Sequence, residues 1–219
     1  MKEKWKLFIQ KNYFPALVSL AVVIYQAICY FLAKFTPFAA HVVGGEIDNA
    51  IPFLPIFIIP YVLWYLFLIV VPCMLYQENK ENFYWYLVTN FLVDTIATII
   101  FVFYPTLLIR PEIHVDNIFT WFVSLIYLGD TPALNCFPSI HCASCFIAIF
   151  IMLKGNKIRR EYRFTTSIFA ILIISSTLFI KQHVVVDVVG AFILAIATVL
   201  LVKITSIHTF VQKKLERKR

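Results

Sequence analysis

The sequence predicts an all-α fold, a bundle of six transmembrane helices with both termini in the cytoplasm and a functional site at the outer face. Composition gives the first reason: of the 219 residues, 61% are hydrophobic and 14% charged, and the mean hydropathy is +0.84. Such a composition is typical of integral membrane proteins. The other two reasons are six long apolar segments and an uneven distribution of lysine and arginine between them. We therefore expect residues 1–219 to form one membrane domain.

Six apolar segments each come near the roughly 20 residues that an α-helix needs to cross the hydrocarbon of a bilayer. The fourth segment is short, so we expect it to be extended by one or two helical turns at its ends. Pro52, Pro55 and Pro60 lack a backbone N–H and are expected to bend or break the start of the second helix. The six expected helices cover residues 14–35, 51–76, 83–108, 139–153, 164–180 and 184–206.

The basic residues predict the orientation of these helices. Of the 19 lysines and arginines, all but Lys34, Arg110 and Lys181 lie at the N-terminus, in the loops after the second and fourth segments, or in the C-terminal tail. Because cytoplasmic loops carry the excess of basic residues, both termini are expected in the cytoplasm. We expect a multi-pass protein of the cell membrane whose site faces the periplasm or the extracellular side. The net charge of +7 orients the chain and predicts no nucleic-acid partner, and no pattern in the sequence indicates an oligomeric state.

The long outer segment Arg110–Pro138 contains an amphipathic stretch, Ile118–Tyr127, that is rich in aromatic residues. Two interpretations of this stretch remain open: a helix that roofs the site, or an aromatic anchor at the membrane interface. In the first outer loop, Glu46 and Asp48 are expected to be solvated. Asp94, in the middle of the third segment, is expected to pair with a polar group in the bundle core, because an unpaired charge at that depth is costly.

Four ionisable residues lie at the outer ends of apolar segments, where such groups are costly and therefore indicate function. His183 and Asp187 are four residues apart, which places them on one face of a helix. The carboxylate can then accept a hydrogen bond from one imidazole nitrogen and leave the other nitrogen free to attack. His141 and Arg110 lie on the same side of the membrane, and a guanidinium has the geometry to hold phosphate. Together these residues predict phosphoryl chemistry on a lipid.

Ser139 opens the fourth segment, where the N–H groups of a helix N-terminus and a hydroxyl can bind phosphate. Taken alone, Ser139 is more simply explained as a helix N-cap. Cys136, Cys142 and Cys145 cluster beside the first histidine but do not have the paired spacing of a zinc site. We therefore expect no metal and no cofactor.

The polar residues and their order resemble the type 2 phosphatidic acid phosphatase (PAP2) superfamily. That family has three signatures: a lysine-containing stretch that ends in Arg-Pro, a Pro-Ser-Gly-His stretch, and a Ser-Arg-x5-His-x3-Asp stretch. The resemblance covers the whole chain, because six helices with an outer site are also the family architecture. The corresponding residues here are Arg110-Pro111, Pro138-Ser139-Ile140-His141, and Ser176-Thr177 followed by His183 and Asp187.

The resemblance implies a role for each of these residues. His183 is expected to be the nucleophile that forms a phosphohistidine, Asp187 to orient and polarise it, and His141 to protonate the leaving lipid oxygen. Arg110 and Ser139 are expected to hold the phosphoryl oxygens. The implied partners are a lipid phosphate substrate and the surrounding membrane lipids.

Three positions depart from the family signatures. The family lysine, arginine and glycine are replaced by Phe103, Thr177 and Ile140. Two phosphate-binding cations are therefore missing, and Lys181 and Tyr104 are the candidates to replace them. Such losses resemble the branch of the superfamily near inositol phosphorylceramide and sphingomyelin synthases, whose members can pass the phosphoryl headgroup to an alcohol.

The first hypothesis is a membrane lipid phosphatase that cleaves a phosphate ester or diphosphate of a lipid through a phosphohistidine. The alternative is a lipid headgroup phosphotransferase, similar to phosphosphingolipid or phosphoinositol synthases, and the stretch from Asp130 to Pro138 also resembles that branch. A third hypothesis is a small proton-coupled transporter with His183 and Asp187 as the relay. The two halves of the sequence lack the matched broken helices that many transporters have, which argues against it. The lipid and the acceptor stay open at this level.

Overall fold

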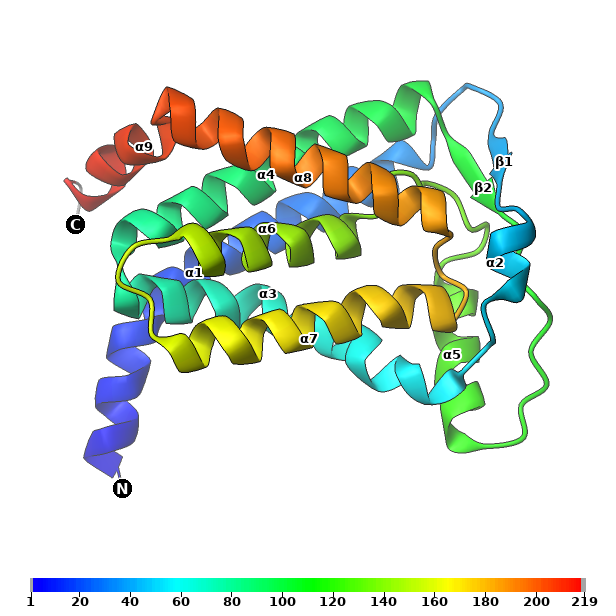
Figure 1. Ribbon diagram of the computed structural model, residues 1–219, viewed down its shortest axis with the longest axis horizontal. Helices are drawn as coiled ribbons and strands as arrows, with labels where there is room; N and C mark the ends of the chain where they lie inside the picture. The colour runs from blue at the N-terminus through cyan, green and yellow to red at the C-terminus, as the bar shows by residue number, and fades with distance from the viewer. Residues whose placement is uncertain (1, 218–219) are drawn as a thin grey trace.

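The computed structural model describes residues 2–217, with side chains from Lys11 onward. The protein is mostly helical, at 74% of its residues, and its only sheet within the described residues has two short strands. A 3₁₀ turn at Pro55–Phe57 leads into the second long helix. The elements are α1 (Lys2–Ala33), β1 (His41–Val43), α2 (Glu46–Ala50), α3 (Ile58–Glu78), α4 (Lys80–Phe103), β2 (Thr106–Leu108), α5 (Ile118–Gly129), α6 (Ile140–Lys154), α7 (Arg160–Phe179), α8 (Val185–Thr205) and α9 (Ile207–Glu216), and Figure 1 labels them.

Five described helices, namely α1, α3, α4, α7 and α8, are long and apolar enough to cross a membrane. The sixth expected span corresponds to α6, which has 15 residues. The extension expected for this segment is not found, because the side chain of Ser139 caps its start and the helix ends at Lys154, before Gly155.

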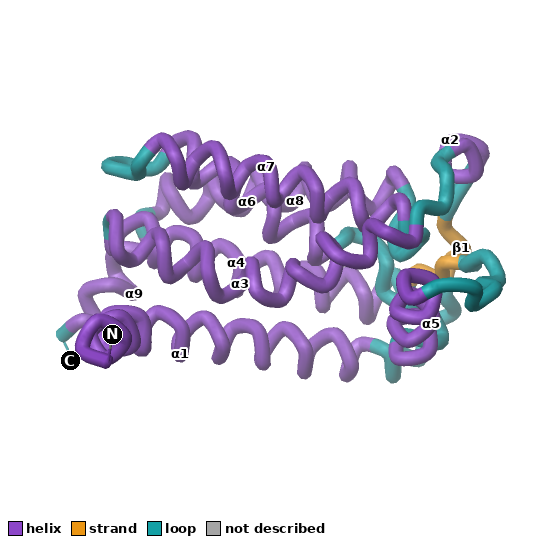
Figure 2. The backbone as a smooth tube through the Cα atoms, turned by 90° about the horizontal axis from the view of Figure 1, so that it is seen from below, coloured by secondary structure: helices purple, strands orange, loops and turns teal. Residues whose placement is uncertain are grey.

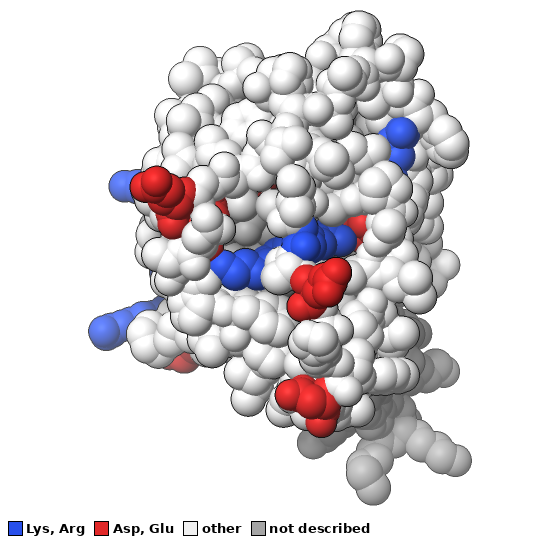
Figure 3. All heavy atoms as spheres, turned by 90° about the vertical axis from the view of Figure 1, so that its right-hand side faces the viewer, with Lys and Arg blue, Asp and Glu red and all other residues white. Residues whose placement is uncertain are grey.

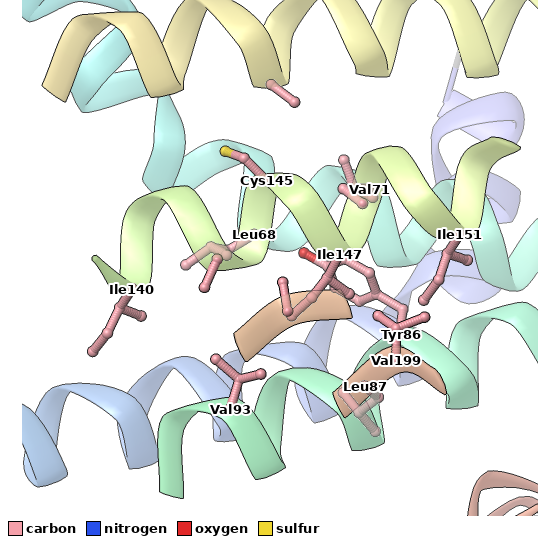
Figure 4. Packing of buried hydrophobic residues seen from close by; sticks show 14 of the residues in the cluster. Leu68, Val71, Tyr86, Leu87, Val93, Ile140, Cys145, Ile147, Ile151 and Val199 are labelled. Carbon is pink, nitrogen blue, oxygen red and sulfur yellow. The ribbon is translucent and has the colours of Figure 1, made fainter. Parts of the chain in front are cut away.

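The short helix α6 lies in the middle of the bundle, between α7 and α8 and against α3 and α4 (Figure 1). One face of it buries Ile140, Ile147 and Ile151 against apolar side chains of the neighbouring helices. Figure 4 shows this packing, in which α3 contributes Leu68 and α8 contributes Val199. Because α6 is enclosed by other helices, burial of its apolar side chains stabilises it without a full membrane-spanning length.

The third expected helix is wrong at its outer end. We expected it to run to Leu108, but α4 ends at Phe103 and residues Thr106–Leu108 form β2, which pairs in parallel with β1. The cause is Pro105, which lacks a backbone N–H and disfavours helical backbone at Tyr104. The start of the second helix was expected to be bent or broken by prolines, and α3 indeed begins only after the 3₁₀ turn.

Both chain ends lie at one end of the bundle, and β1, β2, α2 and α5 lie at the other, which we call the site end (Figure 1). The stretch Ile118–Tyr127 forms most of α5, which lies across the site end (Figures 1 and 2). Its Val123 is fully buried against Ile58, Tyr61 and Ile180. The position of α5 agrees with a roof, whereas the exposure of Trp121 and Phe122 on the same helix also agrees with an interfacial anchor.

Asp94 is buried in α4 and its Oδ1 accepts a hydrogen bond of 3.0 Å from Gln26 Nε2 of α1. This contact confirms the expected core pairing of Asp94. It also ties α1 to α4.

Candidate active site

His183 and Asp187 form a hydrogen-bonded pair at the start of α8. His183 lies in the loop before the helix, rather than on it as the spacing suggested, and its Nδ1 is 3.1 Å from Asp187 Oδ2. The same oxygen accepts a hydrogen bond from the backbone N–H of Val184. Asp187 is fully buried and His183 nearly so. Because a carboxylate accepts, Nδ1 carries the proton and Nε2 keeps its lone pair, which is the arrangement of a nucleophile or base.

His141 faces His183 from the first turn of α6. The centroids of the two imidazole rings are 5.6 Å apart, so both side chains can reach one phosphorus centre. Tyr61 and Trp64 of α3 hold the His141 ring, with centroid distances of 4.8 and 3.9 Å. Among the described residues, His141 Nε2 is buried and has no hydrogen-bond partner. A buried polar atom without a partner is costly, which fits a group that works on a bound molecule.

The hydroxyl of Ser139 caps α6. Its Oγ accepts a hydrogen bond of 3.3 Å from the N–H of Cys142, and the side chain is fully buried. The backbone N–H of Ser139 donates to the carbonyl of Asp187 at 3.2 Å, which joins the starts of α6 and α8. The N-cap interpretation of Ser139 is therefore what the structure has, and a contact with phosphate would come in addition.

Strand β2 positions the segment that leads to α6. The fully buried hydroxyl of Thr106 accepts hydrogen bonds of 3.0 Å from the N–H groups of Cys136 and Phe137. Burial raises the pKa of the Cys136 thiol to about 12, so the thiol is neutral. Within the described part of the chain, no group of three or more His, Cys, Asp or Glu side chains could hold a metal ion.

Arg110 follows β2 and is bound by residues of two other segments. Its Nη2 donates to Asp130 Oδ2 at 2.5 Å and to Gln182 Oε1 at 2.8 Å, and its Nη1 donates to the carbonyl of Asp130 at 3.1 Å. The guanidinium lies 4.7 Å from the ring centroid of Tyr127. Burial raises the pKa of Tyr127 to about 12, and its neutral hydroxyl donates to the carbonyl of Ile180. Arg110 thus contacts Gln182, the residue before His183, but its guanidinium is already paired with the carboxylate of Asp130.

Lys181 lies beside the site, but its ammonium binds the first outer loop. Its Nζ donates to the carbonyls of Asp48 at 2.6 Å and Ile51 at 2.5 Å. The side chain of Asp48 in turn accepts a hydrogen bond of 2.7 Å from the N–H of Val185, at the start of α8. The expectation that Asp48 is solvated is therefore wrong, because the carboxylate satisfies an N–H that the helix itself leaves free. The two contacts fasten the loop over the segment that carries His183.

Tyr104 is not brought to the site. Its ring stacks on that of His41, with centroids 4.4 Å apart, and it lines neither of the cavities at this end. The position of the missing family lysine, Phe103, is 68% exposed and also lies apart from the histidines. Thr177, in place of the family arginine, is buried, and its carbonyl accepts from the N–H groups of Gln182 and His183. At that position the chain uses its backbone to hold the loop of His183.

Two cavities meet at His183. The inner cavity, of about 330 Å³, lies between α1, α3 and α5 and includes His141 and Asp130 among its lining residues. The outer cavity, of about 700 Å³, is lined by the first outer loop and by Arg110 and Lys181. Figure 3 shows the site end, where basic atoms lie in a hollow near the middle of the face. His183 lines both cavities and can therefore meet an apolar molecule on one side and a polar one on the other.

Sequence reasoning missed several residues of this site. Tyr61 and Trp64 were hidden in an apolar segment, although their spacing of three residues places them on one helix face. Gln182 was a polar residue next to a candidate nucleophile, and Asn135, which lines the inner cavity, lies in a loop. Tyr30 lies at the end of α1 and Lys34 in the turn after it, and no pattern linked that part of the chain to the site.

The comparisons with known proteins agree with this geometry. The family model described as the PAP2 superfamily matches residues 83–209, which is more than half of the chain. Neither the curated proteins nor the solved structures gave a match. Members of this superfamily are generally phosphatases or phosphotransferases, which supports an enzyme, and the apolar helices suggest a multi-pass membrane protein. The matched segment runs from α4 to α9 and contains both histidines, Asp187, Arg110 and Ser139, so the chain belongs to the PAP2 superfamily.

Proposed function

We propose that this protein is a membrane lipid phosphatase that cleaves a phosphate ester of a lipid through a phosphohistidine. The observation that carries the proposal is the pair His183–Asp187 facing His141 across 5.6 Å, with both histidines lining a cavity that reaches apolar side chains of α1 and α3. A carboxylate-held imidazole next to a second imidazole is suited to covalent phosphoryl transfer. Membership of the PAP2 superfamily supports the same reaction class.

The reaction runs in two steps. In the first, His183 Nε2 attacks phosphorus, the bond from phosphorus to the lipid oxygen breaks, and His141 gives that oxygen a proton. In the second, His141 takes a proton from water, the water oxygen attacks phosphorus opposite Nε2, the bond from phosphorus to Nε2 breaks, and inorganic phosphate leaves. Asp187 keeps the proton on Nδ1 and stabilises the positive charge that develops on the ring. Arg110, Ser139 and Lys181 are the sequence-predicted groups for the phosphoryl oxygens. Of these, only Arg110 and Lys181 line a cavity at this site.

We also propose that the site faces the outer side of the membrane. Both chain ends lie at the opposite end of the bundle, and the basic residues of the loops favour a cytoplasmic location for that end (Figure 1). A tag inserted at Glu112, in the exposed loop before α5, should be accessible from outside intact cells. Accessibility only after permeabilisation would reverse the orientation.

A lipid headgroup phosphotransferase is the second candidate, and the outer cavity favours it. A phosphate monoester does not need a second cavity of about 700 Å³ beside the nucleophile, whereas a headgroup on the transferred phosphoryl group would lie there. The leaving lipid would still occupy the inner cavity, because His141 lines only that one.

The proposal is tested with purified protein and a panel of lipids. Phosphatidic acid, a prenyl diphosphate and phosphatidylglycerol are incubated separately, with and without a long-chain alcohol, and the released phosphate and lipid products are measured. Phosphate release from phosphatidic acid or the diphosphate supports the phosphatase. Product formation from phosphatidylglycerol, and from neither of the other two lipids, would select the phosphotransferase. Inactivity on all three lipids would overturn both candidates.

A further inference from the structure

The carboxylate of Asp130, at the end of α5, is surrounded by donors from two other segments. Tyr30 OH of α1 and Lys34 Nζ, in the turn that follows α1, donate to its Oδ1 at 2.6 Å each. Arg110 Nη2 donates to its Oδ2 at 2.5 Å. Figure 2 shows the end of α1 meeting α5 at this place. We call the three donor residues, Tyr30, Lys34 and Arg110, the anion cradle.

The charges of the anion cradle do not balance. Two cations face one carboxylate, and the side chains are poorly accessible to water: Lys34 is 15% exposed, Arg110 8% and Asp130 21%. A buried charge without a full counter-charge is unfavourable. A phosphate monoester carries up to two negative charges and has more acceptor oxygens than a carboxylate, so it would satisfy both cations better than Asp130 does.

The anion cradle and the neighbouring Gln182 also have donors that Asp130 does not use. Arg110 Nε and Gln182 Nε2 are both buried and have no hydrogen-bond partner among the residues that the structure describes. Gln182 accepts from Arg110 at 2.8 Å and is the residue before His183. These spare donors would accommodate additional oxygens of a phosphate.

The position of the cradle fits the same ligand. Asp130 and His183 both line the inner cavity, and Arg110 and His183 both line the outer one. The cradle therefore borders the place where a phosphorus atom would meet His183. Lys34 and Tyr30 lie outside the segment that matches the family, residues 83–209, so the family signatures do not include them.

We propose that Tyr30, Lys34 and Arg110 bind the phosphate of the substrate, and that Asp130 occupies their place until the phosphate displaces it. The ligand class is a phosphate or a similar tetrahedral oxyanion, and its identification as the phosphate of a lipid rests on the proposed function. Asp130 ends α5, whose Leu125, Ile126 and Gly129 line the inner cavity. Release of Asp130 would therefore allow α5 to move at the inner cavity, where the lipid is proposed to bind.

The test measures the binding of an anion and needs no turnover. The purified full chain is titrated with inorganic phosphate and with orthovanadate at constant ionic strength, and the shift of the melting temperature gives the apparent Kd. Asp130→Asn keeps the size of the side chain and removes the competing charge, so phosphate should bind about tenfold more tightly than to wild type. Lys34→Met should weaken binding about tenfold in both backgrounds, and Lys34→Arg should restore it. Lys203→Met removes an exposed lysine of α8 that pairs with Glu81 and serves as the control.

The outcomes can be separated because Asp130→Asn and Lys34→Met are expected to change the affinity for phosphate in opposite directions. Unchanged or weaker phosphate binding by Asp130→Asn would overturn the displacement and make Asp130 a group that only positions Arg110. Normal binding by Lys34→Met would remove Lys34 from the phosphate site. If Asp130→Asn does not fold, Lys34→Met and Tyr30→Phe in the wild-type chain still decide whether the cradle binds phosphate. A protein that binds phosphate in this way but releases none from any lipid would contradict the proposed function and not the cradle.

Discussion

The two cavities that meet at His183 differ in what they offer a molecule. The inner cavity is formed by membrane helices, and its lining includes His141 and aromatic residues of α1 and α3 but no lysine or arginine. The outer cavity is about twice as large and is lined by loops, two basic residues and Asp48. An amphipathic substrate would place its chain in the first and its polar part toward the second. This difference indicates that the site is organised around one side chain, His183, which lies at the boundary between an apolar and a polar cavity.

The largest expected effect separates the two histidines. His183 touches both compartments and is the proposed nucleophile, so His183→Ala should lower kcat by about 10⁵-fold on every phosphate ester. His141 serves only the inner compartment, where the leaving group lies. His141→Ala should therefore lower kcat/KM, which reports the first step, about 10³-fold on phosphatidic acid but much less on p-nitrophenyl phosphate, whose leaving group needs little protonation. If His141→Ala abolishes turnover of the aryl phosphate while His183→Ala retains it, the roles of the two histidines are reversed.

The next largest effect is expected at Asp187, whose carboxylate pairs with His183. Asp187→Asn keeps the size of the buried side chain and its acceptor for the N–H of Val184, but it removes the charge that supports the imidazole. We expect kcat to fall by about 10²-fold or more on both lipid and aryl phosphates, with the melting temperature changed by only a few degrees. A loss confined to the lipid substrate would mean that Asp187 shapes the inner cavity instead of supporting His183.

Two glycines allow the cavities to be filled one at a time. A Cβ at Gly129, in the inner lining, or at Gly45, in the outer lining, meets no atom within 4 Å. Gly129→Trp should lower kcat/KM about tenfold for lipid phosphates relative to p-nitrophenyl phosphate. Gly45→Trp should lower the ratio of kcat/KM for a phosphodiester lipid to that for phosphatidic acid by a similar factor, if the headgroup lies in the outer cavity.

The neighbouring exposed residues provide matched controls for these variants. Leu128→Trp and Ile47→Trp add the same ring one residue from Gly129 and two residues from Gly45, at side chains that are 75% and 69% exposed and that line neither cavity. Both control variants should behave as wild type. Equal losses in the two glycine variants on every substrate would show that the two compartments do not act separately.

The smallest effect is expected at the exposed face of α5. Trp121 and Phe122 are exposed on this helix, which roofs the inner cavity. Trp121→Glu should raise KM for a long-chain lipid phosphate a few-fold, because a charge disfavours contact with the membrane interface, and should leave a short soluble phosphate unaffected. Equal loss on both substrates would indicate misfolding of α5 and remove the roof from the account.

The sequence predicted the helices and the main polar residues for physical reasons that are local. Apolar length predicted six spans, of which five are helices long enough to cross a membrane, and the cost of charge in a membrane pointed to His141, His183, Asp187 and Arg110. The strand β2 escaped because three residues carry no measurable periodicity and continue the apolar run of α4. Pro105 was the one signal that could have ended the helix earlier.

The partners of the basic residues could not be predicted, because they depend on contacts between distant segments. Arg110 meets Asp130 twenty residues away, and Lys34 meets the same carboxylate from the turn after α1. Lys181 was expected at the phosphate because it lies two residues from His183. Its backbone is left-handed, with φ of 54°, and its ammonium reaches the first outer loop instead.

The central claim is that His183, at the boundary of the two cavities, carries the phosphoryl group. The most direct measurement is mass spectrometry of protein quenched during turnover of p-nitrophenyl phosphate, with peptides kept at alkaline pH to preserve phosphohistidine. The His141→Ala variant should accumulate the intermediate, because its first step needs little acid whereas its second step has lost the base. We predict phosphate on His183 in this variant and none in His183→Ala. Phosphate on another residue, or turnover without any phosphorylated peptide, would contradict the account.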